Sequence, residues 1–267
     1  MRVQDHDDQP IGRAGVDEFG TGSGRPPRLL PIADAALAYR LIYRRVDALL
    51  RGRAEVAELP VPACPAWTVR QTVAHLVGIA QDIVSLNMEE KAGDSWTQAQ
   101  IDRLGVQSID ELLDLWGQLI DPVTTRLAHE ASACQLVFDA LTHEHDIRGA
   151  LSEPGSRTGD LAFEVALGFS TMMGDQFIRH AGLAALRLLT PTVGSVQLGD
   201  PHTASGRVAL SISDFEALRA LGGRRSVRQL LALPWHGDPT HLLPAFTHLL
   251  PAFSNGGMRP PTDDLVE

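Results

Sequence analysis

The sequence predicts a mainly α protein, in which an up-down four-helix bundle is followed by a small α+β part. Hydrophobic residues make up 44% of the 267-residue chain whereas aromatic residues make up 5%, a composition typical of Ala- and Leu-rich helical proteins. Between residues 31 and 190 apolar residues recur at helical spacing. After residue 190 short alternating runs replace this pattern, and such runs are typical of strands.

The N-terminal segment, residues 1–30, mixes Gly, Pro, Asp and Arg without periodicity. Such a segment cannot bury enough apolar surface to offset its ordering entropy, so we expect a disordered tail. A first helix is expected after Pro31, because the following apolar residues have helical spacing. These residues are Ala36, Leu37, Leu41, Ile42, Val46, Leu49 and Leu50.

Two further helices are marked by their N-terminal capping signals. Residues 59–67 contain three prolines and are expected to be extended, after which Thr68 can cap a helix running from Val69 to about Met88. A short helix should begin at 94–95. The run Ser-Ile-Asp-Glu at 108–111 is a capping box that opens a helix ending near residue 129.

The last two bundle helices are expected at 133–151 and at about 159–189. The first is stopped by Ser-Glu-Pro-Gly at 152–155. In the C-terminal part, VGSVQLGD and RVALSI alternate like strands, and DFEALRAL and SVRQLLAL resemble short helices. We therefore expect a tail at 1–30, a helical bundle at 31–190 and a small α+β domain at 191–267.

Charge and composition exclude several classes of function. The net charge of −10 opposes extended contact with nucleic acid. No stretch approaches the roughly 18 to 20 apolar residues of a membrane span, and the N-terminus has no continuous apolar run typical of a signal peptide. Cys64 and Cys134 cannot form a disulfide framework, so a cytoplasmic protein is expected. The oligomeric state stays open, with a homodimer as one alternative.

The helix at 133–151 carries candidate metal ligands. At 100° per residue, His143 faces the same sector as the apolar residues of this helix, and Asp139 lies at the edge of that sector. Asp139 and His143 are four residues apart, so both side chains can reach one ion. His145 points to the opposite side and Glu144 to the far rim. The run His-Glu-His is therefore not itself expected to chelate a metal.

His75 is the third candidate ligand, because it lies on the flank of the apolar stripe of the 69–88 helix. Two imidazoles and one carboxylate leave coordination positions open, as in catalytic zinc sites. Helical periodicity alone does not separate these ligands from hydrogen-bonded core histidines, which are more common.

Two segments resemble the signature segments of the mycothiol-dependent maleylpyruvate isomerase family, which belongs to the wider DinB-like metalloproteins. They are CPAWTVRQTVAHLVG at 64–78 and FDALTHEHDIRGAL at 138–151, and five residues fit the family pattern: Trp67, His75, Asp139, His143 and Asp146. The resemblance implies a DinB-like bundle that binds a divalent metal, with zinc as the expected ion. The family usually has Glu where this chain has Asp139, so metal affinity or metal choice can differ.

The resemblance also implies roles for two residues outside the ligand set. Asp146 would accept a hydrogen bond from a ligand imidazole and fix its tautomer; the alternative is a solvated or Arg148-paired carboxylate. GGRRS at 222–226 resembles the Gly-Arg segment of the family's sterol-carrier-like second domain. Arg224 would then anchor a substrate or cofactor carboxylate, and the alternative is a surface arginine.

The function implied by the resemblance is a metal-dependent isomerase or transferase that uses the small-molecule thiol mycothiol. Its substrate would be a small electrophile such as maleylpyruvate, and Cys64 is not expected to be the nucleophile. Two other functions remain open. A metal-dependent hydrolase would use bound water and need no thiol, and a non-catalytic protein would bind an apolar ligand or a partner.

Overall fold

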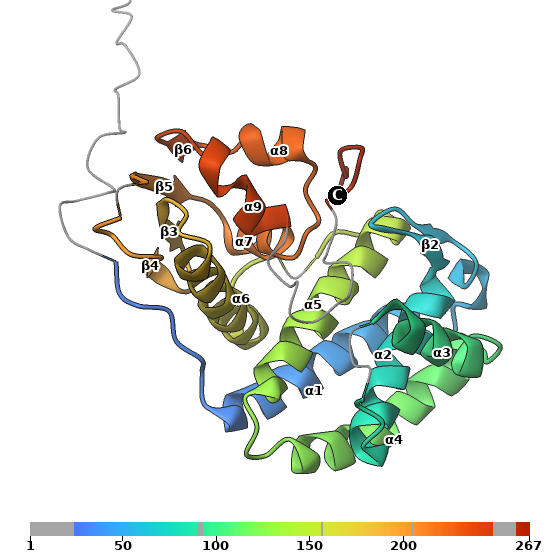
Figure 1. Cartoon of the computed structure of the whole chain (residues 1–267). Coiled ribbons are helices and arrows are strands. Elements are labelled where there is room, and N and C mark those ends of the chain that lie inside the picture. The colour runs from blue at the N-terminus through green and yellow to red at the C-terminus, as the bar shows by residue number, and fades with distance from the viewer. Residues whose placement is uncertain (1–23, 90–92, 156, 204, 248–259) are drawn as a thin grey trace, which may run out of the picture.

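The computed structural model describes residues 24–89, 93–155, 157–203, 205–247 and 260–267. Figure 1 shows the helical bundle beside a small sheet with short helices. The helices are α1 (Ile32–Leu50), α2 (Val69–Ser85), α3 (Asp94–Leu104), α4 (Ile109–Arg126), α5 (Ser132–Leu151), α6 (Leu161–His180), α7 (Asp214–Leu221), α8 (Val227–Leu231) and α9 (Leu243–Thr247). The strands are β1 (Pro60–Val61), β2 (Cys64–Thr68), β3 (Ala185–Thr190), β4 (Gly194–Leu198), β5 (Arg207–Ser211) and β6 (Trp235–His236).

The predicted mainly α fold, with a bundle and a smaller α+β part, is confirmed. In the bundle α2 packs against α4, and α5 packs against both α1 and α6. Their apolar faces form one large core, in which Trp116, Phe163 and Ile42 are among the largest fully buried side chains. The Trp116 Nε1–H donates to Tyr39 Oη at 2.8 Å, so this large residue is buried with its polar atom satisfied.

The predicted helix starts at Val69 and Ile109 are confirmed, and both carry complete capping boxes. The Gln71 N–H donates to Thr68 Oγ1 at 3.3 Å, while Gln71 Oε1 accepts from the Thr68 N–H at 2.9 Å. Before Thr68, the proline-rich segment is extended as expected and forms the β1–β2 hairpin. This hairpin places residues 64–68 directly beside the first turn of α2.

The α+β part is built on a four-stranded sheet with the order β4-β3-β5-β6. The central pair, β3 and β5, is parallel, and β4 and β6 add antiparallel edges. A second, smaller apolar core lies between this sheet and its helices, and includes Leu186, Leu210 and Phe246. Helix α6 contributes to both cores, with Phe163 in the larger core and Ile178 in the smaller.

The prediction of one helix over 159–189 is wrong beyond His180. Helix α6 ends there, and Gly182 then adopts a left-handed conformation with φ 62°. Residues Ala185–Thr190 form strand β3, whose side chains are mostly buried because the strand lies inside the sheet. Its apolar run ALRLLT lacks a clear period of two, so it can be mistaken for the end of a helix.

Part of the expected tail is placed against the sheet. Arg25 pairs in parallel with Val196 of β4: its N–H donates to the Ser195 carbonyl at 3.1 Å, and its carbonyl accepts from the Gln197 N–H at 2.8 Å. Gly24 is needed at this contact, because a Cβ there would meet the Gln197 backbone nitrogen at 2.8 Å. Residues 1–23 lie outside the described residues.

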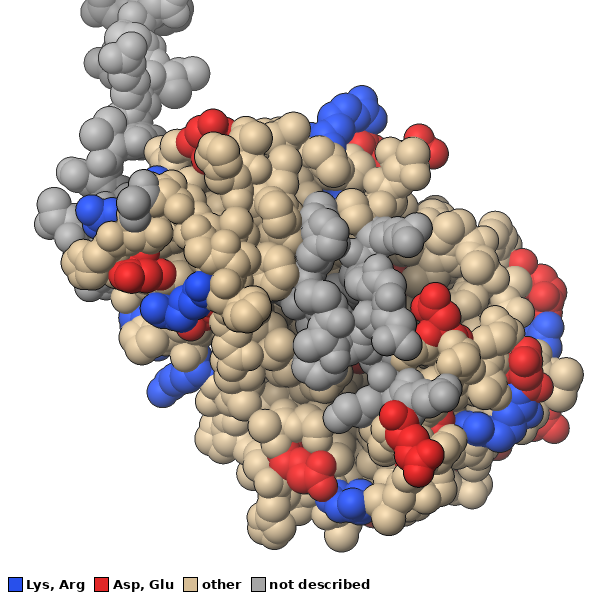
Figure 2. All heavy atoms as spheres, viewed as in Figure 1, with Lys and Arg blue, Asp and Glu red and all other residues tan. Residues whose placement is uncertain are grey.

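The surface carries charges of both signs. On the face drawn in Figure 2, the coloured Lys and Arg side chains lie close to Asp and Glu side chains. Many charged side chains of the described residues form ion pairs, such as Arg51 with Asp114 at 2.7 Å. Within the described ranges, none of the helices is both long enough and apolar enough to cross a lipid bilayer.

Candidate metal centre

His75, Asp139 and His143 converge at the contact between α2 and α5. The His75 Nε2 lies 4.0 Å from Asp139 Oδ2, and the His143 Nε2 lies 3.8 Å from Asp139 Oδ1. The three potential ligand atoms are all within 4.8 Å of one another. Both histidines are buried, whereas the Asp139 side chain is 32% exposed. The structure therefore brings together the three residues that the sequence analysis singled out.

The donor set of this cluster fits a divalent cation. Among the described residues, none donates a hydrogen bond to the buried Asp139 Oδ2. Such an atom is costly unless a cation or water satisfies it. Both imidazoles turn Nε2 toward this carboxylate, and two neutral imidazoles with one carboxylate are common zinc ligands that leave positions open.

The His75 ring is oriented by a buried polar chain that runs into α3. The His75 Nδ1–H donates to Gln100 Oε1 at 2.9 Å, and the Gln100 Nε2–H donates to Asp82 Oδ2 at 2.7 Å. This hydrogen bond selects the tautomer that leaves Nε2 as an acceptor. Burial lowers the pKa of His75 to about 4, so the ring is neutral at pH 7.

The His143 ring is oriented by a carboxylate. Its Nδ1 lies 2.9 Å from Oδ2 of Asp146, which is fully buried one turn further along α5. Burial opposes protonation of His143, but the charge of Asp139 and the contact with Asp146 outweigh it and raise its pKa to about 10, so a metal ion would displace the proton of His143 in order to bind there. Burial likewise opposes ionisation of Asp146, whose pKa is nevertheless held well below its usual range by Arg224 and Arg219.

Two arginines from the C-terminal part approach Asp146. The Arg219 Nη2 lies 2.8 Å from Asp146 Oδ1, and the Arg224 Nη2 lies 2.8 Å from Asp146 Oδ2. The Arg219 side chain is fully buried, and that of Arg224 is 12% exposed. The alternatives of an Arg148-paired Asp146 and a surface Arg224 are therefore wrong. Arg148 instead binds Glu144.

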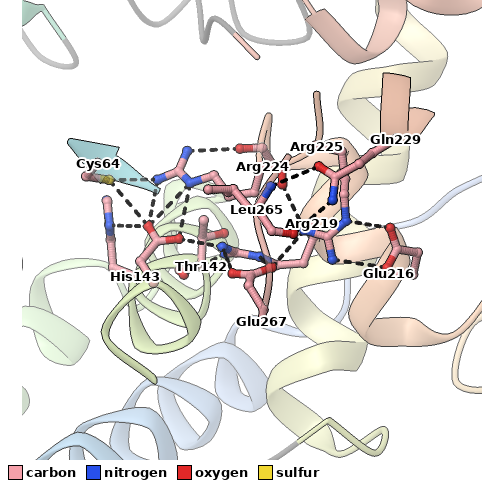
Figure 3. Close-up of polar contacts among 12 residues, drawn as sticks. Cys64, Thr142, His143, Glu216, Arg219, Arg224, Arg225, Gln229, Leu265 and Glu267 are labelled. Carbon is pink, nitrogen blue, oxygen red and sulfur yellow. Dashed lines mark hydrogen bonds and ion pairs between the residues drawn. The ribbon is translucent and has the colours of Figure 1, made fainter. Parts of the chain in front are cut away.

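The charged network continues away from the cluster, as Figure 3 shows. Arg219 and Arg225 both bind the Glu267 carboxylate, with 3.0 Å between Arg219 Nε and Oε2 and 2.7 Å between Arg225 Nη1 and Oε2. Arg225 also binds Glu216 of α7 at 2.6 Å. These ion pairs connect the bundle helix that carries His143 to α7 and to the segment 260–267.

The β1–β2 hairpin supplies Cys64 and Trp67 to the same site. The Trp67 ring packs against both histidines, with centroid distances of 5.0 Å to His75 and 5.7 Å to His143. The Cys64 Sγ lies 3.5 Å from Asp146 Oδ2 and 3.5 Å from Arg224 Nη2. Cys64, His143 and Asp146 form a second group of potential ligand atoms within 4.8 Å. In that group, however, His143 would bind through Nδ1, which faces Asp146.

The other two residues of the His-Glu-His run, Glu144 and His145, are buried in the core. His145 lies on the opposite side of α5, as expected, and its ring packs against Phe163 and Phe215. Glu144 is fully buried and does not lie at the rim as expected, because Arg45 and Arg148 bind it at 2.6 and 3.0 Å. Burial of this carboxylate is tolerated because both cations accompany it.

A cavity of about 490 Å³ opens beside the cluster. His75, Asp139 and His143 lie in its wall together with Cys64 and Arg224. The remaining wall comes from α2, α3, the end of α4 and the first half of α5, and most of those residues are apolar. A small molecule in this cavity can therefore contact Asp139, the most exposed of the three candidate ligands.

Three polar residues of the site were not found by the sequence analysis: Asp82, Gln100 and Arg219. Asp82 and Gln100 lie on different helices, and their contact depends on how α2 and α3 cross. The one available signal was that each is polar at a position on the buried face of its helix, at 2% and 0% exposure. Arg219 is likewise a polar residue at a buried position of its helix, α7.

Comparisons with known proteins found one matching family profile and two similar solved structures. The family profile of the mycothiol maleylpyruvate isomerase N-terminal domain matches residues 39–148. This range contains α2, α5 as far as Arg148 and all three candidate ligands. No functionally curated protein is similar enough in sequence to be matched to the chain.

Two similar solved structures are crystal structures of the mycothiol-dependent maleylpyruvate isomerase. The first has 17% sequence identity and a TM-score of 0.50, and the alignment covers 74% of this chain and 91% of that chain. The second, a single-residue variant, has 16% identity and a TM-score of 0.48, with 73% and 90% covered. The first supports the fold. The matched profile in turn shows that residues 39–148 are similar in sequence to the N-terminal domain of that family.

Proposed function

We propose that the protein is a metal-dependent enzyme that uses a small-molecule thiol such as mycothiol to isomerise, or to add sulfur to, an electrophilic substrate. The observation that carries this proposal is the convergence of two imidazole Nε2 atoms and one carboxylate in the wall of a 490 Å³ cavity. A purely structural metal site would be closed by a fourth protein ligand, whereas this cluster faces a cavity.

His75, Asp139 and His143 would hold the cation. When bound, zinc or a similar ion supplies Lewis acidity that lowers the pKa of a thiol and favours the nucleophilic thiolate at neutral pH. The thiol of the cofactor would then be the nucleophile, so the chain need not supply a nucleophile of its own. The Gln100 and Asp146 contacts keep both Nε2 atoms directed toward Asp139, which is the usual role of the outer partners of metal-ligating histidines.

Arg224 would act on the substrate. Its guanidinium lines the cavity and is held by Asp146 and by the Gly222 carbonyl, which accepts from Nη1 at 3.0 Å. Addition of a thiolate to a conjugated double bond moves negative charge onto the carbonyl oxygen of the electrophile. A fixed guanidinium next to that oxygen stabilises the resulting enolate. Asp146 would therefore position both His143 and Arg224.

Two outcomes can follow from the same adduct. If the bond to sulfur breaks again after rotation about the former double bond, the product is the geometric isomer and the thiol is regenerated. If the α-carbon is instead protonated, the sulfur stays on the product and the reaction is a thiol transfer. The family points to the first outcome for maleylpyruvate, and the cavity geometry is compatible with both.

The first experiment tests the metal and the thiol together. Purified protein loaded with zinc should hold about one ion per chain, measured by elemental analysis, and should promote addition of mycothiol to at least one of a panel of electrophiles. The His75→Ala, His143→Ala double variant should lose both the ion and the activity. A matched double variant, His180→Ala with His202→Ala, changes two exposed histidines and should keep both.

Two results would contradict the proposal. Activity that does not require any thiol would indicate a hydrolase that uses bound water. Protein that stays free of metal after zinc supplementation, and that has no activity toward the panel, would instead favour a non-catalytic binding protein.

A further inference from the structure

The cavity continues well past the metal cluster as a groove between α2 and α5. On α2 its wall includes His75, Ile79, Ile83 and Leu86, and on α5 it extends from His143 back toward the N-terminus. The α2 residues span eleven positions, which correspond to about 16 Å along the helix axis at 1.5 Å per residue. The candidate metal centre therefore lies at one end of a groove that is much longer than the cluster itself.

The walls of this groove beyond the cluster are mainly apolar. Ile79 and Ile83 of α2 face Leu136 on α5, while Trp96 of α3 and Leu127 after α4 also line the groove. All five are between 5% and 8% exposed, so what remains open to solvent is their surface toward the groove. The Trp96 ring is fixed, because its Nε1–H donates to the Asn87 carbonyl at 2.9 Å.

The two arginines that line the groove within the described residues are both ion-paired. Arg224, at the cluster, binds Asp146 at 2.8 Å, and Arg126, at the far end, binds Glu130 at 3.0 Å. Neither pair carries a net positive charge. A substrate with two carboxylates would therefore lose hydration along the apolar walls, and apart from a metal ion at the cluster the arginine nearest the reacting end would be Arg224.

Leu86 adds an independent observation at the groove. It caps α2 in the left-handed conformation with φ 63°, which is unfavourable for leucine and usual for Gly or Asn. Its side chain is also 60% exposed although it lines the groove. An exposed apolar side chain at this position extends the apolar surface available to a bound ligand.

We propose that the groove binds an apolar arm of the electrophilic substrate, so that the preferred substrate is an enone or related acceptor with an alkyl or aryl chain of about five carbons or more. This inference rests on the proposed function for its reaction. The thiol adds across the conjugated double bond, with the sulfur forming a bond to the β-carbon and the thiol proton ending on the α-carbon, so no oxidant or reductant is needed. The double bond would lie at the cluster and the chain between α2 and α5.

Ketones that cannot react test the groove without turnover. Binding of 2-nonanone and 2-pentanone is measured by calorimetry and by the fluorescence of the tryptophans in the wall. Each of the four additional methylenes should tighten binding by about 3-fold when buried, or roughly 80-fold in total. Equal affinity for the two ketones, or no detectable binding of 2-nonanone, would overturn the proposal.

Substitution of Leu86 locates the binding site. Leu86→Asn removes the apolar side chain and suits the left-handed backbone, so the variant should fold at least as stably as the wild type. We expect it to bind 2-nonanone about 3- to 10-fold more weakly. Val84→Asn is the control, because Val84 is also an exposed apolar residue of α2, at 39%, and lies outside the groove wall. Equal weakening by both variants would contradict the assignment.

Turnover separates this inference from the proposed function. With zinc and mycothiol, kcat/KM is compared for 3-nonen-2-one, 3-penten-2-one and maleylpyruvate, and we expect 3-nonen-2-one to exceed each of the other two by more than 10-fold. Turnover of all three without preference for the longer chain would overturn the inference and leave the proposed function intact. Selective ketone binding without turnover of any compound would support the groove and contradict the proposed function.

Discussion

His75 and His143 present the same atom, Nε2, to the Asp139 carboxylate. The groups that hold the other ring nitrogen, Nδ1, are here called the support of each histidine, and the two supports differ in chemistry and in location. His75 is held by a neutral amide, that of Gln100, which is in turn bound to Asp82 on the same helix as His75. His143 is held by the carboxylate of Asp146, which is paired with Arg219 and Arg224 from the C-terminal part. One support is thus local to the bundle, and the other crosses to the α+β part.

This difference determines how each histidine responds to changes elsewhere. The His75 support depends on the close approach of α2 and α3, so it should be sensitive to packing. The His143 support depends on charges that are buried together, so it should be sensitive to any change that leaves one of them unpaired. Among the described contacts, those of Asp146 with Arg219 and Arg224 connect the α+β part to the candidate metal centre.

Asp146→Asn should have the largest effect, because it leaves Arg219 and Arg224 without their shared carboxylate. Breaking a buried ion pair in this way costs about 3 kcal/mol or more of the free energy of unfolding. Zinc affinity should also fall by about 10- to 100-fold, since the partner of His143 Nδ1 loses its charge. Chemical denaturation and competition with a chromogenic chelator measure the two effects.

The control for this prediction is Asp121→Asn. Asp121 also pairs with an arginine, Arg40, but its side chain is 79% exposed. Exposed ion pairs contribute about 0 to 1 kcal/mol, so this variant should differ little from wild type in stability or zinc affinity. If Asp146→Asn behaved like Asp121→Asn, the His143 support would not depend on the buried charges.

Local sequence signals predicted much of the bundle and brought forward the three candidate ligands that converge in the structure. Capping residues such as Thr68 and Ser108 fix helix starts through contacts within four residues, and the sequence displays them directly. The four-residue spacing of Asp139 and His143 likewise fixes their shared face before any tertiary contact is known. Periodicity placed His75 on the flank of the apolar stripe of its helix, and the matched segments then favoured a ligand over a core histidine.

The features that were missed depend on contacts between distant segments. Gln100 reaches His75 only because α3 crosses α2 closely, and Arg219 reaches Asp146 across 73 positions of the chain. Glu144 was expected at the far rim from its angular position on the helix, but it is buried because Arg45 of α1 binds it there. Strand β3 was assigned to a helix because its burial comes from neighbouring strands, which its own sequence does not reveal.

Gln100→Leu should have the next largest effect, and it tests the neutral support. Leucine leaves both His75 Nδ1 and a buried oxygen of Asp82 without their partner, which costs about 1 to 3 kcal/mol of the free energy of unfolding. Zinc affinity should fall by about 10-fold, because the His75 tautomer is no longer fixed. Gln98→Leu is the control on the same helix, since Gln98 is exposed and bonds only to Asp102 in the described contacts.

Gly78→Ala should have the smallest effect, and it tests whether packing alone maintains the His75 support. A Cβ at Gly78 would lie 2.5 Å from Gln100 Cβ and 2.6 Å from Gln100 Cγ, so Gln100 has to shift. Overpacking costs about 1 to 3 kcal/mol, and alanine returns up to about 1 kcal/mol as the better helix former, so we expect a net loss near 1 kcal/mol. Because Gln100 keeps its polar groups, zinc affinity should fall by less than in Gln100→Leu.

Gly149→Ala separates this packing effect from helix propensity. A Cβ at Gly149 of α5 meets only the Glu267 side chain, at 3.6 Å, which is an ordinary contact. This variant should therefore gain about 0.5 to 1 kcal/mol from helix propensity and keep its zinc affinity. If Gly78→Ala also gained stability and kept its affinity, Gln100 would have room to move without disturbing His75. The approach of α2 to α3 would then not be what orients the ring.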